Sequence, residues 1–222
     1  MSMKTQVVKA TSPAAPAASP PTRGAAILRP FCRIAQSIAR MSTTPANSRA
    51  GLMADFTISI VLLCAGLRRH DVHPLAALVT LLSGMLLFSF VEYCFHRWLF
   101  HGPVRVTEEG HRKHHEQPLG YDSLPFFVSP LLILGLAGLL AVAVSTTFAL
   151  LLAGALAAGY ATYGLSHLVI HIRRFQHPLA RRWAAAHHIH HCHPEANFGV
   201  TTPLWDILLG TRYVSKQKLR AS

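Results

Sequence analysis

The apolar residues of this chain are gathered into long blocks instead of being spaced along one face of a helix. Four such blocks lie at about 53–67, 74–94, 124–144 and 147–170. A helix rises ~1.5 Å per residue and a bilayer core is ~30 Å thick, so a helix of about 20 apolar residues crosses it. The pattern therefore predicts an all-α, multi-pass integral membrane protein with about four transmembrane helices.

The last two blocks form the clearest pair. From 123 to 172 there are 50 residues without an Asp, Glu, Lys or Arg, enough at ~1.5 Å per residue to cross a ~30 Å core twice. Only the neighbourhood of Ser145 and Thr146 interrupts this stretch, so we expect a tight antiparallel hairpin. The first block is shorter and contains Asp55, which leaves open whether it spans the bilayer, re-enters it or lies at its interface.

The number of spans predicts which segments share one side of the membrane. With four spans, the N-terminus, the segment 96–122 and the tail from 173 onward fall on the same face. Seven Lys or Arg precede the first block and eight follow the last, so the positive-inside rule places this face in the cytoplasm. Arg68 and Arg69 lie in the opposite loop and count against this orientation. The membrane would be the inner membrane in a bacterium or the endoplasmic reticulum in a eukaryote.

Residues 1–50 differ in composition from the rest. They are rich in Ala, Pro, Ser and Thr, and no acidic residue precedes Asp55, which is typical of a disordered basic tail before a membrane domain at 51–222. A transit peptide, or a true start at Met41 or Met53, would fit the same pattern. The formal net charge of +12 comes mainly from the two termini. Without a stacking or groove-reading motif, this charge indicates contact with the membrane surface and no nucleic-acid partner.

Histidines form four clusters beside the predicted spans. Ten of the fifteen belong to them: His96 and His101 in HRWLFH, His111, His114 and His115 in HRKHH, His167 and His171 in HLVIH, and His187, His190 and His191 in HHIHH. Helical residues four apart differ by only ~40° in direction, so the first and last histidines of HxxxH and HxxHH can coordinate the same ion. The middle histidine of HxxHH can then turn toward a second ion. The first cluster has a spacing of five, ~140° around a regular helix, so its two rings share a face only if the helix end unwinds.

Ten imidazoles at paired helical spacing beside apolar spans indicate a metal site, because imidazoles at membrane depth need partners. No Asp or Glu has ligand spacing with them, and Glu92, one turn before His96, is better placed to orient an imidazole ring from behind. Zinc tolerates an all-histidine site but has no redox chemistry, whereas iron activates oxygen. We therefore expect a cytosolic helical cap that holds two irons, replaceable by zinc in preparations, and that uses O2 and an external electron donor.

The clusters lie within segments that resemble a known family. The segments EYCFHRWLFH (92–101), GHRKHHEQP (110–118), the HxxxH pair and HHIHHCHPEANFGVTTPLWDILLGT (187–211) resemble the fatty acid hydroxylase and sterol desaturase superfamily of membrane di-iron enzymes. Within it they are most similar to the catalytic domain of fatty acid 2-hydroxylases. The resemblance implies that the ten clustered histidines are the metal ligands, with His188 and His193 as supporting groups. It also implies an electron-transfer partner, such as a b-type cytochrome or a ferredoxin with its reductase.

The function implied is the oxygen-dependent hydroxylation of a lipid acyl chain at carbon 2, on a fatty acid or on the N-acyl group of a sphingolipid. A sterol, carotenoid or sphingoid-base hydroxylase or desaturase would use the same site with a different pocket. A metal transporter is a hypothesis from another class. Transporters place ionisable ligands near the bilayer midplane, whereas the block centres at 81–88, 131–143 and 150–158 contain none. The segment 198–211, uncharged except for Asp206, either covers the site or rests on the membrane surface, with its Trp as an interfacial anchor.

Overall fold

The chain divides by its internal contacts into two units, Met1–Ser37 and Ile38–Ser222. The structure is a computed structural model that describes residues 36–121 and 123–215. Every regular element in these ranges is helical, which confirms the all-α prediction. The elements are α2 (Pro45–Leu67), α3 (Pro74–Cys94), η1 (Phe95–Phe100), α4 (Arg105–Glu116), α5 (Val128–Ala143), α6 (Thr146–Ile172), α7 (Pro178–Cys192) and α8 (Leu204–Leu208), all in the second unit. Of the tail predicted for 1–50, residues 1–35 lie outside the described residues.

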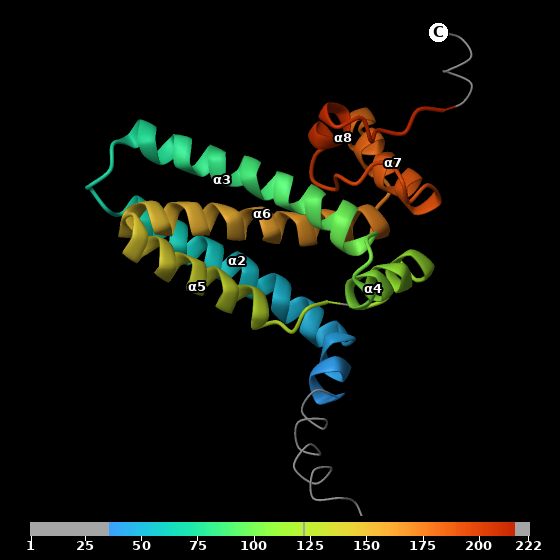
Figure 1. The fold of residues 1–222 in the computed structure, drawn as a ribbon, viewed down its shortest axis with the longest axis horizontal. Helices are drawn as coiled ribbons and strands as arrows, with labels where there is room; N and C mark the ends of the chain where they lie inside the picture. Colours follow the sequence, from blue (N-terminus) through green and yellow to red (C-terminus); the bar gives the residue numbers. More distant parts are fainter. Residues whose placement is uncertain (1–35, 122, 216–222) are drawn as a thin grey trace, which may run out of the picture. The chain divides into compact units, whose positions relative to one another are not determined.

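Helix α6 is the centre of an apolar layer formed by α2, α3, α5 and α6. It packs against the other three helices (Figure 1), and its buried positions include an alanine at every fourth residue from Ala149 to Ala161. Small side chains let helix backbones approach closely, which favours helix association in lipid. On the α3 side, a Cβ at Gly84 would stand 2.6 Å from the Cβ of Ala155. The close approach of α3 to α6 therefore requires glycine at that position.

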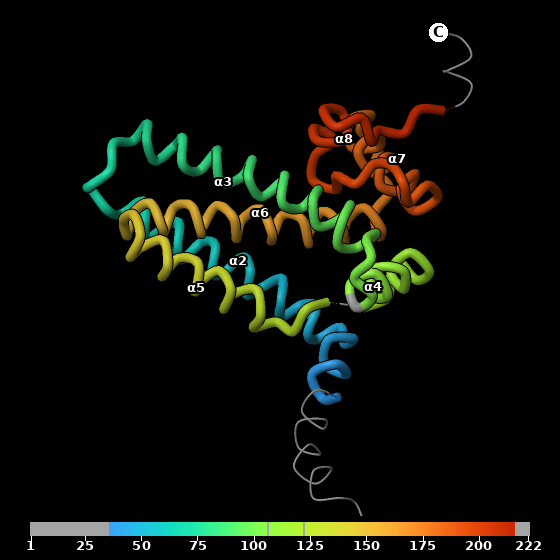
Figure 2. The backbone as a smooth tube through the Cα atoms, viewed as in Figure 1, coloured from blue at the N-terminus to red at the C-terminus, as the bar shows by residue number. Residues whose placement is uncertain are grey.

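The predicted hairpin between the last two apolar blocks is confirmed. Only Val144 and Ser145 separate α5 from α6, and Ser145 Oγ accepts a hydrogen bond from Phe148 N at 3.2 Å as the N-cap of α6. The two helices lie antiparallel and in contact (Figure 2).

Three helices have the length and composition to cross a membrane: Pro45–Leu67, Pro74–Phe100 and Thr146–Ile172. The first apolar block, 53–67, is part of a 23-residue helix. Thr44 caps this helix and a proline occupies its first turn, so it starts well before the apolar run. The block at 124–144 instead forms the 16-residue α5, which at ~24 Å is shorter than a ~30 Å bilayer core.

Helix α5 is short because α2 holds the chain that precedes it. Asn47 Nδ2 donates to Leu124 O at 2.9 Å, and Asn47 Oδ1 accepts from Phe126 N at 3.0 Å. Pro125 also disfavours a helical conformation at the residue before it. Since Asn47 falls inside the segment predicted as a tail, the ordered domain begins before residue 51.

The histidine-bearing elements gather at one end of the apolar layer. Helices α4 and α7 and the ends of α3 and α6 lie together there, whereas the α2–α3 loop and the α5–α6 turn lie at the opposite end (Figure 1). This placement agrees with the expectation that all four clusters share one side.

Candidate metal centre

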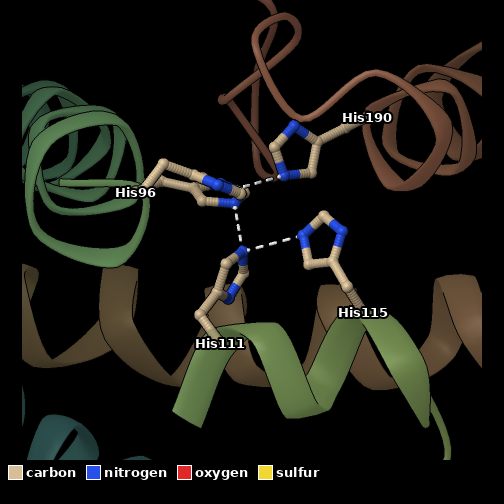
Figure 3. Close-up of side chains that lie close together, drawn as sticks. His96, His111, His115 and His190 are labelled. Atoms are coloured by element: carbon tan, nitrogen blue, oxygen red, sulfur yellow. Dashed lines mark hydrogen bonds between the residues drawn. The ribbon is translucent and has the colours of Figure 1, made fainter. Parts of the chain in front are cut away.

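Ten histidine side chains converge in two groups of five. Group A is His96, His101, His111, His115 and His190, and group B is His114, His167, His171, His187 and His191. Within each group, one ligand-capable nitrogen per residue lies within 4.8 Å of all the others. Figure 3 shows four group A imidazoles, from three different helices, turned toward a common centre. The structure therefore brings together all ten histidines that the sequence spacing selects.

The first cluster is brought together by a π-helical turn. His101 N donates to His96 O at 3.3 Å, an i→i+5 bond in η1, which continues α3 directly. The two imidazole rings lie 5.3 Å apart and are stacked at 27°. The unwinding expected from the spacing of five therefore takes the form of a wider helical turn. Gly102 lets the chain leave this turn, because a Cβ there would overlap the carbonyl oxygen of Trp98.

Helices α4 and α7 each divide their three histidines between the two groups. In α4 the first and last histidines of HRKHH belong to group A, and His114 belongs to group B. In α7 the first and last histidines of the HxxHH run belong to group B, and His190 belongs to group A. Contacts between elements close the groups, with Nε2 distances of 3.0 Å from His101 to His190 and 3.2 Å from His114 to His191.

Two group A imidazoles are oriented from behind by one loop. His96 Nδ1 donates to Phe198 O at 2.5 Å, and His190 Nδ1 donates to Ala196 O at 2.7 Å. A carbonyl oxygen only accepts, so each Nδ1 carries the ring hydrogen and each Nε2 presents a lone pair. Both imidazoles are buried, at 1% and 0% exposed. Their ligand nitrogens are therefore fixed toward the centre of group A.

Two buried carboxylates hold the same loop. Glu92 Oε1 accepts from Val200 N at 2.6 Å and makes no hydrogen bond to an imidazole within the described part of the chain, so any orienting effect on His96 is indirect. Asp206, for which the spacing rules predict no role, is 1% exposed. Its two oxygens accept from Phe198 N and from Gly199 N, both at 2.8 Å. The sequence feature that could have pointed to Asp206 is that it is the only charged residue in the segment 198–211.

The two supporting histidines differ in position. The His188 ring lies 5.7 Å from that of His171, at the edge of group B. His193 stacks on Tyr213 at 4.4 Å, and its Nδ1 lies 3.4 Å from a carboxylate oxygen of Glu195. His188 therefore adjoins a metal group, whereas the ring of His193 contacts residues outside both groups.

The segment 198–211 places the Phe198 ring against group A. The Phe198 ring lies between 5.7 and 5.9 Å from the rings of three group A histidines. Trp205, expected as an interfacial anchor, packs on α3, with its ring 4.7 Å from that of Phe90 and its Nε1 donating to Ser89 Oγ at 3.0 Å. These contacts fasten this segment to the helix that leads into η1.

Burial favours the neutral form of the grouped imidazoles on α4 and α7 by lowering their pKa. Desolvation, with Coulombic repulsion from neighbouring imidazoles, lowers the pKa of His190 and His191 to about 3 and that of His111 to about 2. The same causes move the pKa of His187 far below its ordinary value. Near neutral pH, these converging nitrogens therefore present lone pairs.

The donor set fits metal ions. Two ligands at right angles on an ion with ~2.1 Å bonds lie ~3.0 Å apart, and His111 Nε2 lies 3.0 Å from the Nε2 atoms of both His96 and His115. In group B, two Nε2 atoms lie 3.1 and 3.2 Å from that of His187. His167 Nε2 is buried without a hydrogen-bond partner in the described part of the chain. An ion bound by group B would satisfy this atom.

An open pocket of about 410 Å³ adjoins group A. It is lined by Arg97, Trp98, His101, Pro194, Glu195 and Phe198. The Arg97 guanidinium lies 5.4 Å from the Trp98 ring, within cation–π range. The pocket therefore lies beside an imidazole of group A, that of His101.

Comparisons with known proteins agree with this geometry. The fatty acid hydroxylase family model matches residues 81–211, more than half of the chain. The chain is 30% identical over 142 residues to the dihydroceramide fatty acyl 2-hydroxylase FAH1 of Arabidopsis thaliana, covering 60% of each. It is 30% identical over 153 residues to the human fatty acid 2-hydroxylase, covering 62% of this chain and 40% of the relative.

The chain thus spans from 40% to 60% of the length of these two relatives. Among solved structures, full-length Scs7p, of which only the hydroxylase domain is visible, has a similar fold. Its TM-score is 0.65 at 22% identity, over 79% of this chain and 69% of that one. On the family match over residues 81–211, which include all ten clustered histidines, the chain belongs to the fatty acid hydroxylase family.

Proposed function

We propose that this protein is a membrane oxidoreductase that uses dioxygen to hydroxylate a lipid acyl chain at carbon 2. The observation that carries the proposal is the pair of five-imidazole groups at the end of a layer of apolar helices. The substrate would be a fatty acid or the N-acyl group of a sphingolipid. The similarity to a fatty acid 2-hydroxylase and to a dihydroceramide fatty acyl 2-hydroxylase supports this class of substrate and this carbon.

The imidazoles of group A would hold one iron ion and those of group B another. Zinc fits the same donors and stands higher in the affinity order, so it would displace iron in a preparation. Bound iron supplies the redox chemistry that activates dioxygen toward an unactivated C–H bond. One oxygen atom enters the C–H bond and the other leaves as water, which consumes two electrons and two protons. An external donor is therefore required, such as a b-type cytochrome, or a ferredoxin with its reductase.

The chain's own residues would position the reactants and exclude water. The segment 198–211 would close over group A. Exclusion of water from the site would then strengthen the electrostatic interactions there. The acyl chain would reach the site from the bilayer, along the face of α3 that exposes Leu82, Leu86 and Phe90. The cap formed by α4, α7 and α8 would face the cytoplasm, as the basic residues before the first apolar helix and after the last one favour.

Two other functions would use some of the same features. A hydroxylase or desaturase acting on a sterol, carotenoid or sphingoid base would need the same donors and a different substrate pocket. A metal transporter would need ligands near the bilayer midplane, whereas both histidine groups are built where the apolar helices end.

The test is conversion of substrate by the full chain in lipid vesicles. We expect the iron-loaded protein, given dioxygen, a reductant and a fatty acid or ceramide, to form a product heavier by one oxygen, located at carbon 2 by fragmentation. The zinc-loaded protein is the matched control and should form none, because zinc does not change oxidation state. Metal flux across the vesicles without an oxygenated lipid would replace the proposal with transport.

A further inference from the structure

The two histidine groups differ in what supports them from behind. In group A, the Nδ1 atoms of His96 and His190 donate to carbonyls of one loop at 2.5 and 2.7 Å. In group B, His187 is equally buried, at 1% exposed, but its Nδ1 has no hydrogen-bond partner in the described ranges. The most buried ligand of group B therefore lacks the support that the most buried ligands of group A possess.

The supporting loop is itself fixed by Asp206. The two carboxylate oxygens accept from Phe198 N and Gly199 N, which flank the very carbonyl that binds His96. Thr211 Oγ1 donates to the same carboxylate at 2.7 Å, and Thr211 also bonds Tyr93 at 3.0 Å. The carboxylate is therefore tied to the loop on one side and, through Thr211, to α3 on the other.

Such support affects metal binding through the imidazole tautomer. A neutral imidazole binds a metal only through the nitrogen that lacks hydrogen, and a carbonyl behind the ring keeps the hydrogen on the far nitrogen. A ring held in this way loses little orientational freedom when an ion arrives. A ring whose far nitrogen has no partner keeps a buried, unsatisfied N–H when the ion is bound, and this lowers the stability of the bound state.

We propose that the two metal sites are unequal, that group A binds its ion first and more tightly, and that Asp206 is the positioning residue responsible for part of the difference. Asp206 touches neither the ion nor the imidazoles and acts through the carbonyl of Phe198. The proposal rests on the proposed dimetal site. It concerns metal affinity alone and not the reaction.

The first experiment measures stepwise zinc affinity of the metal-free full chain in detergent, by competition with a fluorescent zinc chelator. We expect two steps that differ by at least ~10-fold, the scale on which outer partners of ligands change affinity. The tighter step should persist in His187→Ala, which removes a group B ligand, and should be lost in His96→Ala. Two equal steps in the unaltered protein, or loss of the tighter step in His187→Ala, would overturn the proposal.

The second experiment repeats the titration on Asp206→Asn. The asparagine keeps the size of the side chain but turns an NH2 group toward one of the two loop N–H groups, so one hydrogen bond is lost. We expect the tighter step to weaken by ~10- to 100-fold, with the weaker step unchanged. A change in both steps, or in neither, contradicts a role for Asp206 in positioning group A.

Two further variants supply a control and a substitute for Asp206→Asn. Asp55→Asn is the matched control, because Asp55 is also buried and accepts a bond, from Ser129 Oγ at 2.5 Å, but on α2 far along the chain from either group. It should shift neither zinc step. If Asp206→Asn does not fold, Glu92→Gln loosens the same loop through Val200 N and should also weaken the tighter step alone.

Failure of this proposal can be told apart from failure of the proposed function. A protein with unequal zinc sites in the predicted order that oxygenates no lipid refutes the function and keeps the inference. A protein that hydroxylates an acyl chain but binds two zinc ions with equal affinity refutes the inference and keeps the function.

Discussion

Helices α4 and α7 carry the same HxxHH spacing but divide their histidines between the two groups in opposite ways. Helix α4 gives two imidazoles to group A and one to group B, and α7 gives one to group A and two to group B. The two helices differ in their surroundings. In α7, His187 and His190 are buried, whereas Arg112 on the outer side of α4 forms exposed ion pairs with Glu108 and Glu116.

This difference separates what spacing determines from what packing determines. The ~40° offset between residues four apart fixes which histidines of a helix can share an ion, and it does so equally in α4 and α7. Burial and support from behind come from the rest of the chain. The loop around Phe198 packs on α7, where Trp183 Nε1 donates to Val200 O at 2.7 Å. The grouped histidines of α7 are therefore more buried than those of α4.

The largest expected effect comes from removing ligands in combinations that cross the two helices. The double variant His114→Ala with His187→Ala removes two group B ligands and leaves group A whole. We expect it to retain one tightly bound zinc ion. The double variant His114→Ala with His190→Ala removes one ligand from each group, and both ions should bind more weakly. Both variants should lose at least ~100-fold in hydroxylation, since even the outer partners of ligands contribute 10- to 100-fold.

Zinc content by elemental analysis, together with the chelator titration, distinguishes the two double variants. If zinc content instead followed the helix from which the ligands were removed, so that two α7 changes spared one ion, the crossed assignment would be wrong. The variant His187→Ala with His190→Ala supplies that comparison, and we expect it to weaken both ions.

The second prediction concerns acid and the metal-free protein. An unfolded histidine has a pKa near 6.5, whereas burial lowers the pKa of His190 to about 3. Below about pH 6.5 this histidine binds a proton in the unfolded chain but not in the folded chain, so the free energy of unfolding falls as pH drops toward about 3. Each fully buried imidazole contributes a slope of ~1.4 kcal/mol per pH unit within this window.

Thermal unfolding between pH 7.5 and 5.5 measures this slope. We expect His190→Asn to reduce it more than His115→Asn does, because His115 on α4 is only partly buried. Protons and metals compete for the same nitrogens, so zinc should raise the unfolding temperature more at pH 7.5 than at pH 5.5. Equal slopes for the two variants would remove the distinction between the more buried histidines of α7 and the less buried ones of α4.

Sequence spacing predicts the grouping of residues four apart well, because helical geometry alone sets it. The pair His96 and His101 shows the limit, since a π-helical turn depends on the packing that follows α3 and leaves no pattern at regular spacing. Asp206 could not be assigned because its hydrogen bonds, to two loop N–H groups and to Thr211, follow no regular spacing in the sequence. The start of α2 could not be placed from hydropathy, since Thr44 and Asn47 define it through polar contacts made by residues outside the apolar run.

A smaller effect is expected from Trp183, which holds α7 to the loop around Phe198. Trp183→Phe keeps the ring contacts but leaves the carbonyl of buried Val200 without its donor, which should lower stability by ~1–3 kcal/mol. Trp98→Phe is the matched control, because that ring is 55% exposed. A lower unfolding temperature in the first variant alone is the expected result. No difference between the two variants would mean that the loop is not fastened through α7.

The smallest effect is expected on the exposed side of α4. Arg112 Nη1 lies 2.6 Å from Glu116 Oε1, and Arg112 Nε lies 3.9 Å from Glu108 Oε1, with all three side chains from 41% to 56% exposed. Exposed helical pairs contribute only ~0.3–0.5 kcal/mol each, so Arg112→Ala should lower stability by less than ~1 kcal/mol. The loss should vanish in ~1 M salt, where the screening length falls to ~3 Å. Lys113→Ala is the control, because it removes a neighbouring positive charge and gains the same helix propensity. Denaturant unfolding of both variants at low and high salt measures the difference. A larger loss, or one that salt does not reduce, would show that α4 depends on Arg112 as strongly as α7 depends on its buried contacts, and the contrast between the two helices would fail.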